Sequence, residues 1–375
     1  MTITADQVRQ RLKAIKGPDG RDLIASGKLS DIVISDAKVF FSLTVDASAA
    51  PAWEAVRKAA ENAVRSIPGV ASVLIALTAE RSGGSGPAGG SPVKAPPPRA
   101  GAASRSVAGV PGVEAVIAVA SGKGGVGKST TAVNLALGLR DLGMRVGLLD
   151  ADIYGPSMPR LLAIKGKPET IGGRMLRPME SFGLKVMSIG FLVDEETPMI
   201  WRGPMVMTAI TQMLREVEWG TLDIMVVDMP PGTGDAQLTL AQQVPLAGAV
   251  IVSTPQDLAL IDARRGIAMF RRVDVPVLGI VENMSYFLCP HCGERSDPFG
   301  HGGAKAEAER LGVPFLGEVP LEIEIRETSD AGLPIVATKP DSTHAKIYRD
   351  IAASVRDQMA GGGKARTAPR IVIES

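Results

Sequence analysis

Short apolar runs alternate with longer amphipathic stretches from residue 113 onward. Each run predicts a buried strand, and the stretches between most of them carry apolar residues at helical spacing. This alternation predicts an α/β domain with a mainly parallel sheet covered by helices on both faces, in which ligands bind beyond the carboxyl ends of the strands. The predicted strands are residues 116–120, 146–149, 224–227, 249–252, 277–281 and 315–316.

The first 80 residues predict a separate, small α+β domain. Thr4 and Gln7 have the spacing of a capping box at the start of a helix. The apolar positions that follow predict the order helix, strand, helix, strand. They are Val8, Leu12 and Ile15, then Val39, Phe41, Leu43 and Val45, then Trp53, Val56, Ala60, Val64 and Ile67, and finally Val73, Ile75 and Leu77.

A segment of different composition, residues 81–112, separates these two regions. It is rich in Gly, Ser and Pro, and it contains four basic and no acidic residues. Such a segment buries too little surface to offset the entropy of ordering, so it predicts a flexible linker. The sequence thus predicts an α+β domain at 1–80, a linker at 81–112, an α/β domain at 113–360 and a flexible tail at 361–375.

Composition narrows the class of protein. Of the 375 residues, 45% are hydrophobic and 22% are charged, which excludes wholesale disorder. Lys and Arg total 41 against 40 Asp and Glu, so a generally basic nucleic-acid binder is excluded. The polar start lacks the core of a secretory signal, no apolar run is long enough to span a bilayer, and the two cysteines, three positions apart, exclude a disulfide scaffold. We therefore expect a cytoplasmic protein whose partners are neither nucleic acid nor membrane.

A glycine-rich motif follows the first predicted strand of the larger domain. The segment SGKGGVGKST contains G-x-x-x-x-G-K-S and precedes a predicted helix. Glycines let backbone N–H groups converge on phosphate oxygens at the positive end of a helix. Lys128 would pair with the β- and γ-phosphates of ATP, and the Ser129 hydroxyl would hold Mg²⁺. The residues predicted to bind the nucleotide here are Gly122, Lys123, Gly124, Gly125, Val126, Gly127, Lys128, Ser129 and Thr130.

Three aspartates stand at the ends of predicted strands. Asp150 and Asp152 follow the strand at 146–149, and Asp228 follows the strand at 224–227. A carboxylate that is buried without a partner is costly, so these positions need a partner such as hydrated Mg²⁺. Any one of them alone could be a helix cap, but three beside a phosphate-binding loop predict a metal and water site.

Lys123 makes SGKGGVGKST a deviant Walker A sequence. Together with LLDADIYGPS, MVVDMPPGTGD and IVENMSYFLCPHCGE, it resembles the Mrp (ApbC) family of iron–sulfur carrier ATPases, a branch of the superfamily that also holds plasmid-partition and septum-positioning ATPases. This resemblance covers residues 113–358. The stretch GPDGRDLIASGKLSDI, with the strand–helix–strand order that follows it, resembles the small MIP18-like (DUF59) domain.

The resemblance to the carrier ATPases implies a P-loop NTPase fold, ATP hydrolysis and a role for each site residue. Lys123 would reach across a homodimer to the partner's ATP, so Lys123, Lys128 and Asp152 would be catalytic. Asp152 would orient the attacking water. The other implied roles are support of Mg²⁺ by Asp150 and Asp228 together with Ser129, and contact with adenine by Asn283.

Cys289 and Cys292 form a C-x-x-C pair that a glycine follows. Two thiolates on a tight turn can share a soft metal, but they are too few for a tetrahedral site or a 4Fe–4S cluster. The resemblance implies that a homodimer supplies four, with a 4Fe–4S cluster between the subunits that comes from an upstream scaffold and passes to apoproteins. The residues themselves leave three other interpretations: a zinc site within one chain that adds His301 and Asp297, a redox pair and a metal-free turn.

A different functional class also stays open. A spatial-organisation or regulatory ATPase of the partition or septum-positioning type, with a structural zinc site, would share the phosphate motif. Such a protein would need a terminal amphipathic helix for a membrane or a basic face for DNA. The tail GGGKARTAPRIVIES contains a glycine run and a proline, and the net charge is only +1, so the carrier ATPase is favoured.

Overall fold

The computed structural model describes residues 4–18, 20–30, 32–35, 38–46, 49–70, 72–80, 109–172, 175–193 and 203–362. The chain divides into two compact units, residues 1–106 with 195–208 and residues 107–194 with 209–375. Most of the predicted linker and most of the predicted tail, residues 81–108 and 363–375, lie outside the described residues. The domain boundaries at 80, 112 and 360 therefore stay predictions.

In its described residues up to Glu80, the smaller unit has two helices and three strands. They are, in chain order, α1 (Ala5–Leu12), β1 (Val33–Ser35), β2 (Lys38–Asp46), α2 (Ala50–Arg65) and β3 (Ser72–Glu80). The predicted capping box is present, because Thr4 Oγ1 accepts from the Gln7 N–H at 3.4 Å and Gln7 Oε1 accepts from the Thr4 N–H at 3.1 Å. Ile15, expected on the same helical face, lies beyond the end of α1.

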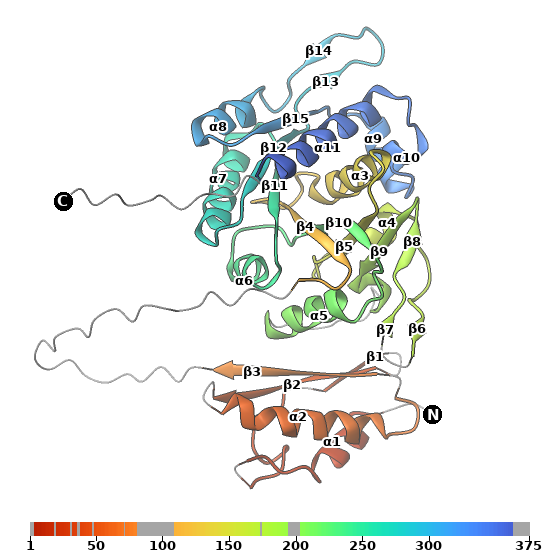
Figure 1. Ribbon diagram of the computed structural model, residues 1–375, viewed down its shortest axis with the longest axis vertical. Helices are drawn as coiled ribbons and strands as arrows, with labels where there is room; N and C mark the ends of the chain where they lie inside the picture. Colours follow the sequence, from red (N-terminus) through yellow and green to blue (C-terminus); the bar gives the residue numbers. More distant parts are fainter. Residues whose placement is uncertain are drawn as a thin grey trace, which may run out of the picture. The chain divides into compact units, whose positions relative to one another are not determined.

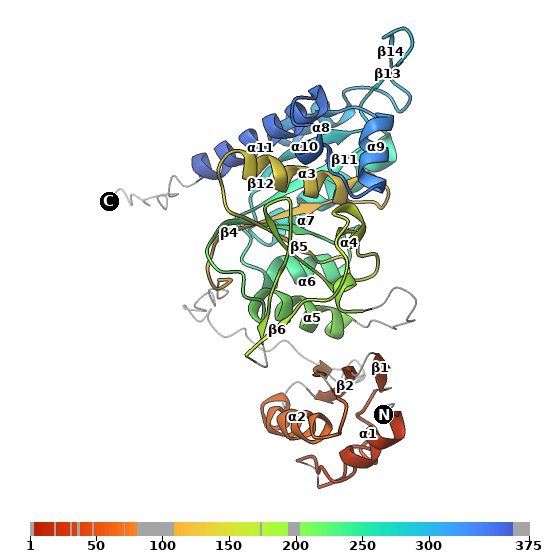
Figure 2. The same cartoon turned by 90° about the vertical axis from the view of Figure 1, so that its right-hand side faces the viewer.

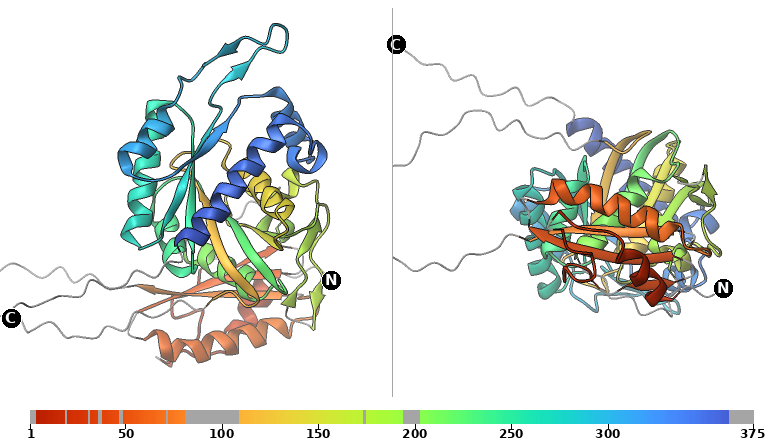
Figure 3. Two further views of the ribbon diagram at one scale, coloured as in Figure 1. Left: turned by 45° about the horizontal axis from the view of Figure 1, so that its top comes forward. Right: turned by 90° about the horizontal axis from the view of Figure 1, so that it is seen from below.

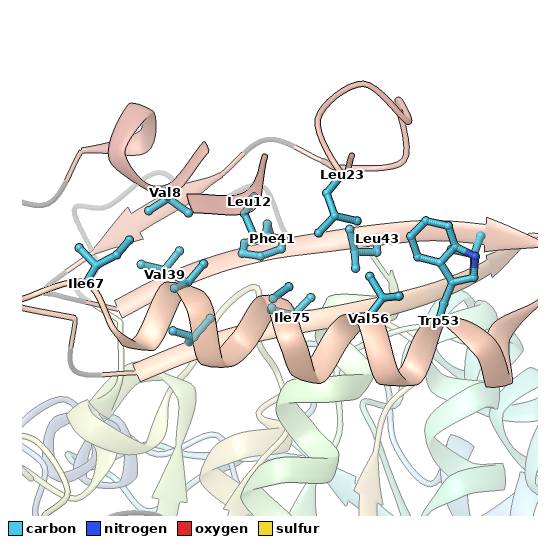
Figure 4. Close-up of a cluster of buried hydrophobic side chains, with 14 residues drawn as sticks. Val8, Leu12, Leu23, Val39, Phe41, Leu43, Trp53, Val56, Ile67 and Ile75 are labelled. Carbon is cyan, nitrogen blue, oxygen red and sulfur yellow. The ribbon is translucent and has the colours of Figure 1, made fainter. Parts of the chain in front are cut away.

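Helix α2 connects the parallel strands β2 and β3, and β1 pairs with β2 in the antiparallel sense. The apolar core of this unit gathers side chains from both helices and the sheet, and Phe41 and Trp53 are almost fully buried in it (Figure 4). The predicted order of helix, strand, helix and strand is confirmed. Strand β1 is an addition to it, because three residues are too few to show a period in the sequence.

The larger unit contains an eight-stranded sheet with the order β15–β12–β11–β4–β10–β5–β9–β8 (Figure 1). Neighbouring strands are parallel except for β8 and β9. All six predicted strands are present, and β8 and β9 extend the sheet at one edge. The strands are β4 (Val113–Ala120), β5 (Val146–Asp150), β8 (Met179–Ser181), β9 (Leu184–Ser188), β10 (Leu222–Asp228), β11 (Gly248–Ser253), β12 (Val277–Asn283) and β15 (Phe315–Val319).

Helices cover both faces of this sheet, as expected. The crossover from β4 to β5 through α3 runs along the sheet in the opposite direction to the crossovers through α7 and α8, so right-handed connections put α3 on the other face from α7 and α8. Helix α11 packs on α3, and α7 packs on α8 (Figure 1). The helices are α3 (Lys128–Asp141), α4 (Met158–Leu161), α5 (Gly203–Arg215), α6 (Asp235–Gln243), α7 (Asp257–Arg272), α8 (Gly303–Leu311), α9 (Ile323–Asp330), α10 (Ile335–Thr338) and α11 (Thr343–Gly362), with a 3-10 turn, η1 (Ile189–Phe191).

The parallel sheet brings the predicted motifs together at the carboxyl ends of its strands. Strand β4 lies inside the sheet between β10 and β11, and the phosphate motif follows its carboxyl end. Asp228 at the end of β10 is in register with Asp150 at the end of β5 and with Val119 of β4. The predicted fold class, a P-loop NTPase sheet beside a small α+β domain, is confirmed. Among the described helices, none is long and apolar enough to cross a membrane.

Candidate functional site

The phosphate loop, residues 121–127, connects β4 to α3. Gly127 precedes the helix with φ of +80°, and a Cβ at this position would lie 2.1 Å from Asn283 Nδ2, so a larger residue would strain the backbone and displace the Asn283 amide. Gly122 packs closely on α7, because a Cβ there would lie 2.3 Å from the carbonyl of Asp262. The free N–H groups of the first turn of α3 and the positive end of its dipole face the loop, which is the arrangement that binds phosphate.

Lys128 and Ser129 begin α3 and meet Asp228 from the end of β10. The Lys128 ammonium lies 2.5 Å from Asp228 Oδ1 and 3.9 Å from Asp152 Oδ2. The Ser129 hydroxyl donates to Asp228 Oδ2 at 2.6 Å. The structure therefore brings together four of the predicted site residues, which come from three separate strand ends.

Burial controls the electrostatics of this group. Asp150 and Asp228 are fully buried and Asp152 nearly so. Burial raises the pKa of all three carboxyls, and the pKa of Asp150 reaches about 7 because the charge of Asp228 adds to the effect. Lys128 opposes this by lowering the pKa of Asp152 and Asp228. Several carboxylates in one desolvated place favour a cation, and Ser129 Oγ with the Asp228 carboxylate is an all-oxygen donor pair that suits Mg²⁺.

Asp150 differs from the other two aspartates in its partners. Its Oδ2 accepts hydrogen bonds from Ser188 Oγ and the Ser157 N–H, both at 2.9 Å. The Met158 N–H is a further donor at 3.2 Å, and Oδ1 accepts from the Asp152 N–H at 3.1 Å. The carboxylate thus fixes the turn that carries Asp152. Sequence reasoning missed Ser188, because this residue lies on β9, a strand between β5 and β8 that was not among the predicted elements.

Lys123 and Asn283, both predicted to contact nucleotide, differ in their solvent exposure. The Lys123 side chain is exposed, and its carbonyl accepts a hydrogen bond from Ser121 Oγ at 2.9 Å. The Asn283 side chain is buried, and its Nδ2 donates to the carbonyl of Val126 at 2.8 Å. In this structure Asn283 supports the loop itself, so its contact with adenine stays a prediction, as does the action of Lys123 on a partner's ATP.

The cysteines lie at the turn of a short hairpin, which we call the cysteine hairpin (residues 287–296). It consists of β13 (Phe287–Leu288), β14 (Arg295–Ser296) and the turn between them. The Cys289 N–H donates to the Glu294 carbonyl at 2.9 Å, and the Gly293 N–H donates to the Cys289 carbonyl at 2.8 Å. The hairpin projects from the sheet of its own unit (Figures 2 and 3). Its tip is therefore open to a partner.

Both cysteines are free thiols, and Cys292 is the more exposed. The N–H groups of Cys292 and His291 point at the Cys289 sulfur and, with the Cys292 thiol, lower the pKa of the Cys289 thiol. The thiolate is the form that binds metals, so the turn prepares Cys289 as a ligand. Two thiolates on an exposed turn suit a soft metal or cluster that is exchanged rather than stored.

The zinc interpretation within one chain is not supported by the geometry. Among the described residues, the potential metal ligands that lie within 4.8 Å of one another are Glu282, His301 and Glu318, and this group does not include the cysteines. The guanidinium of Arg295 already stands here, with Nη2 2.6 Å from His301 Nδ1 and 3.9 Å from Glu318 Oε2. An internal cation thus occupies the place where a metal would compensate the carboxylates. Asp297 binds Arg295 Nε at 3.1 Å instead of facing the cysteines.

Residues 112–356 match the family model described as ParA, NUBPL iron-transfer P-loop NTPase. The protein belongs to this family. A second model, described as iron–sulfur cluster assembly protein, matches residues 5–75. The predicted ATPase class, the resemblance to iron–sulfur carrier ATPases and the resemblance of the small domain are thereby confirmed at the level of the family.

Relatives of this NUBPL-family ATPase agree with both matches. An iron–sulfur cluster carrier protein of Synechocystis is 44% identical over 364 residues, which cover 96% of this chain and 98% of the relative. The iron–sulfur cluster transfer protein NUBPL of Dictyostelium discoideum is 55% identical over 252 residues, 67% of this chain and 78% of that one. A nucleotide-binding protein of Archaeoglobus fulgidus, solved in complex with ADP, is 41% identical with a TM-score of 0.55, covering 62% of this chain and 91% of that one.

Proposed function

We propose that this NUBPL-family ATPase binds an iron–sulfur cluster on Cys289 and Cys292 and transfers it to apoproteins. The observation that carries the proposal is the exposed cysteine hairpin on the same unit as a complete phosphate loop. The hairpin prepares a thiolate and leaves it accessible, which suits a cargo that arrives and leaves. The names of the relatives, cluster carrier and cluster transfer protein, support the same function.

The cluster bridges two chains in this proposal. One chain offers two thiolates, and the described residues bring no third ligand to them. A 4Fe–4S cluster takes four cysteine ligands, and a two-fold axis beside the hairpin supplies them from a homodimer. The cargo would therefore sit between the two hairpins, exposed to the scaffold that loads it and the apoprotein that receives it.

ATP would bind at the phosphate loop with Mg²⁺ beside it. Ser129 and Asp228 would hold the metal, which screens the phosphate charge, and Asp150 would keep the surrounding turn in place. Lys128 would exchange its contact with Asp228 for the β- and γ-phosphates. Asp152, fixed through its backbone by Asp150, would orient the attacking water. The exposed Lys123 would reach the ATP of the partner subunit and stabilise the charge of the transferring phosphoryl group.

We also place the protein in the cytoplasm, where thiols stay reduced, because both cysteines are free and a carrier needs them so. Its partners in this proposal are a second copy of the chain, an upstream cluster scaffold and recipient apoproteins. The small N-terminal domain, which matches an iron–sulfur assembly model, suits a role in contact with those proteins.

Anaerobic reconstitution with ferrous iron and sulfide tests the function. We expect about four iron and four sulfide per two chains, with the broad visible absorbance of a cluster, and loss of both on mixing with an apo-ferredoxin that gains them. Ser354→Ala, a change on an exposed face of α11, is the control for handling, since Ser354 only bonds within its own helix. Protein that retains zinc and never takes up iron and sulfide would overturn the carrier function.

A further inference from the structure

The phosphate loop and the cysteine hairpin are joined by a very short piece of chain. Asn283, the last residue of β12, binds the Val126 carbonyl inside the loop, and Cys289 follows six positions later. The contact at the loop is tight, because Gly127 approaches Asn283 so closely that no Cβ would fit between them. A change in the backbone at 126–127 therefore acts directly on the end of β12.

The segment at the end of β12, residues 282–286, is held by several hydrogen bonds. The buried Glu282 carboxylate accepts from Ser285 Oγ and the Ala304 N–H, both at 2.6 Å. Met284 turns the chain with φ of +55°, a conformation that residues other than glycine seldom adopt. The Ser285 N–H donates to the Val319 carbonyl of β15 at 3.0 Å. Glu282 thus ties the segment to α8, and Ser285 ties it to β15.

Arg295 connects that segment to the hairpin. Its guanidinium lies 4.2 Å from the centre of the Tyr286 ring, on which it stacks. The same side chain binds His301 and Asp297, which lie beyond the hairpin, while its backbone belongs to β14 and pairs with Leu288. Arg295 thus fixes the angle at which the turn with the cysteines leaves the unit.

We propose that residues 282–286 transmit the state of the phosphate loop to the cysteine hairpin, with Arg295 on the ring of Tyr286 as the positioning contact. Phosphates that bind the loop N–H groups shift the backbone at Val126, and Asn283 passes this shift to the segment. Tyr286 then moves under Arg295, and the hairpin changes the spacing and exposure of its thiols. The inference rests on the proposed function only in taking the hairpin as the cargo site.

Thermodynamic linkage makes this coupling reciprocal. If Mg·ADP changes the affinity of the thiols for a metal by some factor, a metal on the thiols changes the affinity for ADP by the same factor. Loss of the Arg295–Tyr286 contact removes the connection while each site keeps its own residues. Variants without this contact should therefore bind nucleotide normally, but the nucleotide should no longer alter the reactivity of the thiols.

Thiol alkylation measures the coupling without any cluster. The rate of reaction of Cys289 and Cys292 with iodoacetamide is compared in the free protein and with saturating Mg·ADP. We expect the wild-type rate to change about fivefold or more, which is the lower end of ordinary coupling between sites. Tyr286→Phe keeps the ring and should keep that change, whereas Tyr286→Leu should reduce it to less than about twofold, with the Kd for ADP and the melting temperature unaltered.

Two further variants make the outcome decisive. Arg295→Lys keeps the charge but loses the planar stacking and should behave like Tyr286→Leu. Arg177→Lys alters an exposed ion pair with Glu169, away from the hairpin, and should behave like wild type. A wild-type rate that ignores Mg·ADP, or an effect that persists in both Tyr286→Leu and Arg295→Lys, would overturn the inference. Persistence is the result expected if ADP merely buried the hairpin in a dimer. Either result would leave cluster reconstitution, and so the proposed function, untouched.

Discussion

The ammonium group of Lys128 lies 2.5 Å from a carboxylate oxygen of Asp228, and both side chains are buried. In the absence of nucleotide, Lys128 therefore neutralises a carboxylate that burial would otherwise leave uncompensated. Nucleotide binding must replace this contact by one between Lys128 and phosphate, with a cation taking over Asp228. We therefore expect the phosphate site to contribute to the stability of the domain as well.

Removing the lysine should consequently affect both activity and stability. We expect Lys128→Met to abolish ATP hydrolysis and to lower the free energy of unfolding by about 3–5 kcal/mol near neutral pH. The double variant Lys128→Met/Asp228→Asn should recover most of that stability and stay inactive. Urea unfolding and phosphate release measure the two effects. A double variant that is no more stable than Lys128→Met would show that the ion pair is unimportant for the fold.

Asp152 stands close enough to the site to act on water without holding the nucleotide, since its Oδ2 lies 3.9 Å from Lys128. We expect Asp152→Asn to bind ATP within about threefold of wild type and to hydrolyse it about 10²- to 10⁴-fold more slowly, the usual contribution of a group that directs proton transfer. Binding is measured with a fluorescent nucleotide and hydrolysis by phosphate release. Asp350→Asn, at an exposed ion pair with Lys346, is the control. Hydrolysis at the parental rate would remove Asp152 from the mechanism.

Lys123 is exposed, so it is free to act on a neighbouring chain. If it acts across a dimer, a mixture of Lys123→Ala and Lys128→Ala chains should recover hydrolysis that neither variant has alone. One of the two sites in such a heterodimer has Lys128 from its own chain and Lys123 from the other. The rate is followed against the fraction of heterodimer, measured by native mass spectrometry. Absence of any recovery with heterodimer present would show that Lys123 acts within its own chain or has no role in hydrolysis.

Cluster binding should depend on both cysteines together. Because symmetry doubles each substitution, Cys289→Ala or Cys292→Ala removes two of four ligands, and reconstituted iron should fall to less than about a tenth of the wild-type content. ATP hydrolysis, whose residues lie in other loops, should persist. His301→Ala should retain the full iron and sulfide content, since His301 contacts Arg295 and not the thiols. Loss of metal in His301→Ala would instead favour the zinc site within one chain.

The nucleotide-free protein should become less stable as pH rises from about 4 to about 7. Burial raises the pKa of Asp150 to about 7 and raises those of Asp152 and Asp228, so the folded protein holds protons that the unfolded chain releases. Each such proton lowers the free energy of unfolding by at most ~1.4 kcal/mol per pH unit in this window. Asp223, whose pKa Arg145 lowers to about 2, works in the opposite sense but contributes a constant amount above about pH 5.

Urea unfolding across that window checks this prediction, with Asp150→Asn as the variant. Its slope should be smaller than that of wild type, because the group with the pKa of about 7 is gone. Mg·ADP should also reduce the slope, since a cation beside Asp228 stabilises the charged carboxylates. Stability that rises steadily over the window would contradict the assignment.

Sequence alone predicts the phosphate loop well, and the structure explains why. The loop is a local feature, in which Gly127, Lys128 and Ser129 follow one another between a buried strand and its helix. The aspartates were also predictable, because they stand at strand ends and the parallel topology aligns those ends. For the phosphate loop and the aspartates, the sequence pattern and the three-dimensional fold therefore indicate the same site.

The contacts made by Glu282, Arg295 and Ser188 were not predictable in this way. Arg295 meets His301 and Tyr286 only because β14 pairs with β13 and so returns the chain toward the end of β12, and Glu282 meets Ala304 only because α8 begins beside β12. Ser188 reaches Asp150 from β9, a strand between β5 and β8 whose pairing the apolar pattern does not specify. Such contacts depend on the tertiary arrangement of separate elements, which the hydrophobic periodicity within a single element does not predict.

Strand β4, which lies between β10 and β11, and the cysteine hairpin should open on different time scales. Residues 116–120 of β4 are buried and hydrogen-bonded inside the sheet, so we expect their backbone amides to exchange with solvent only when the unit opens as a whole. The cysteine hairpin has two-residue strands and an exposed tip, so we expect its hydrogen bonds to open locally without unfolding of the unit. A cluster could thus be bound and released through local opening of the hairpin, while the strand that carries the phosphate loop keeps its hydrogen bonds.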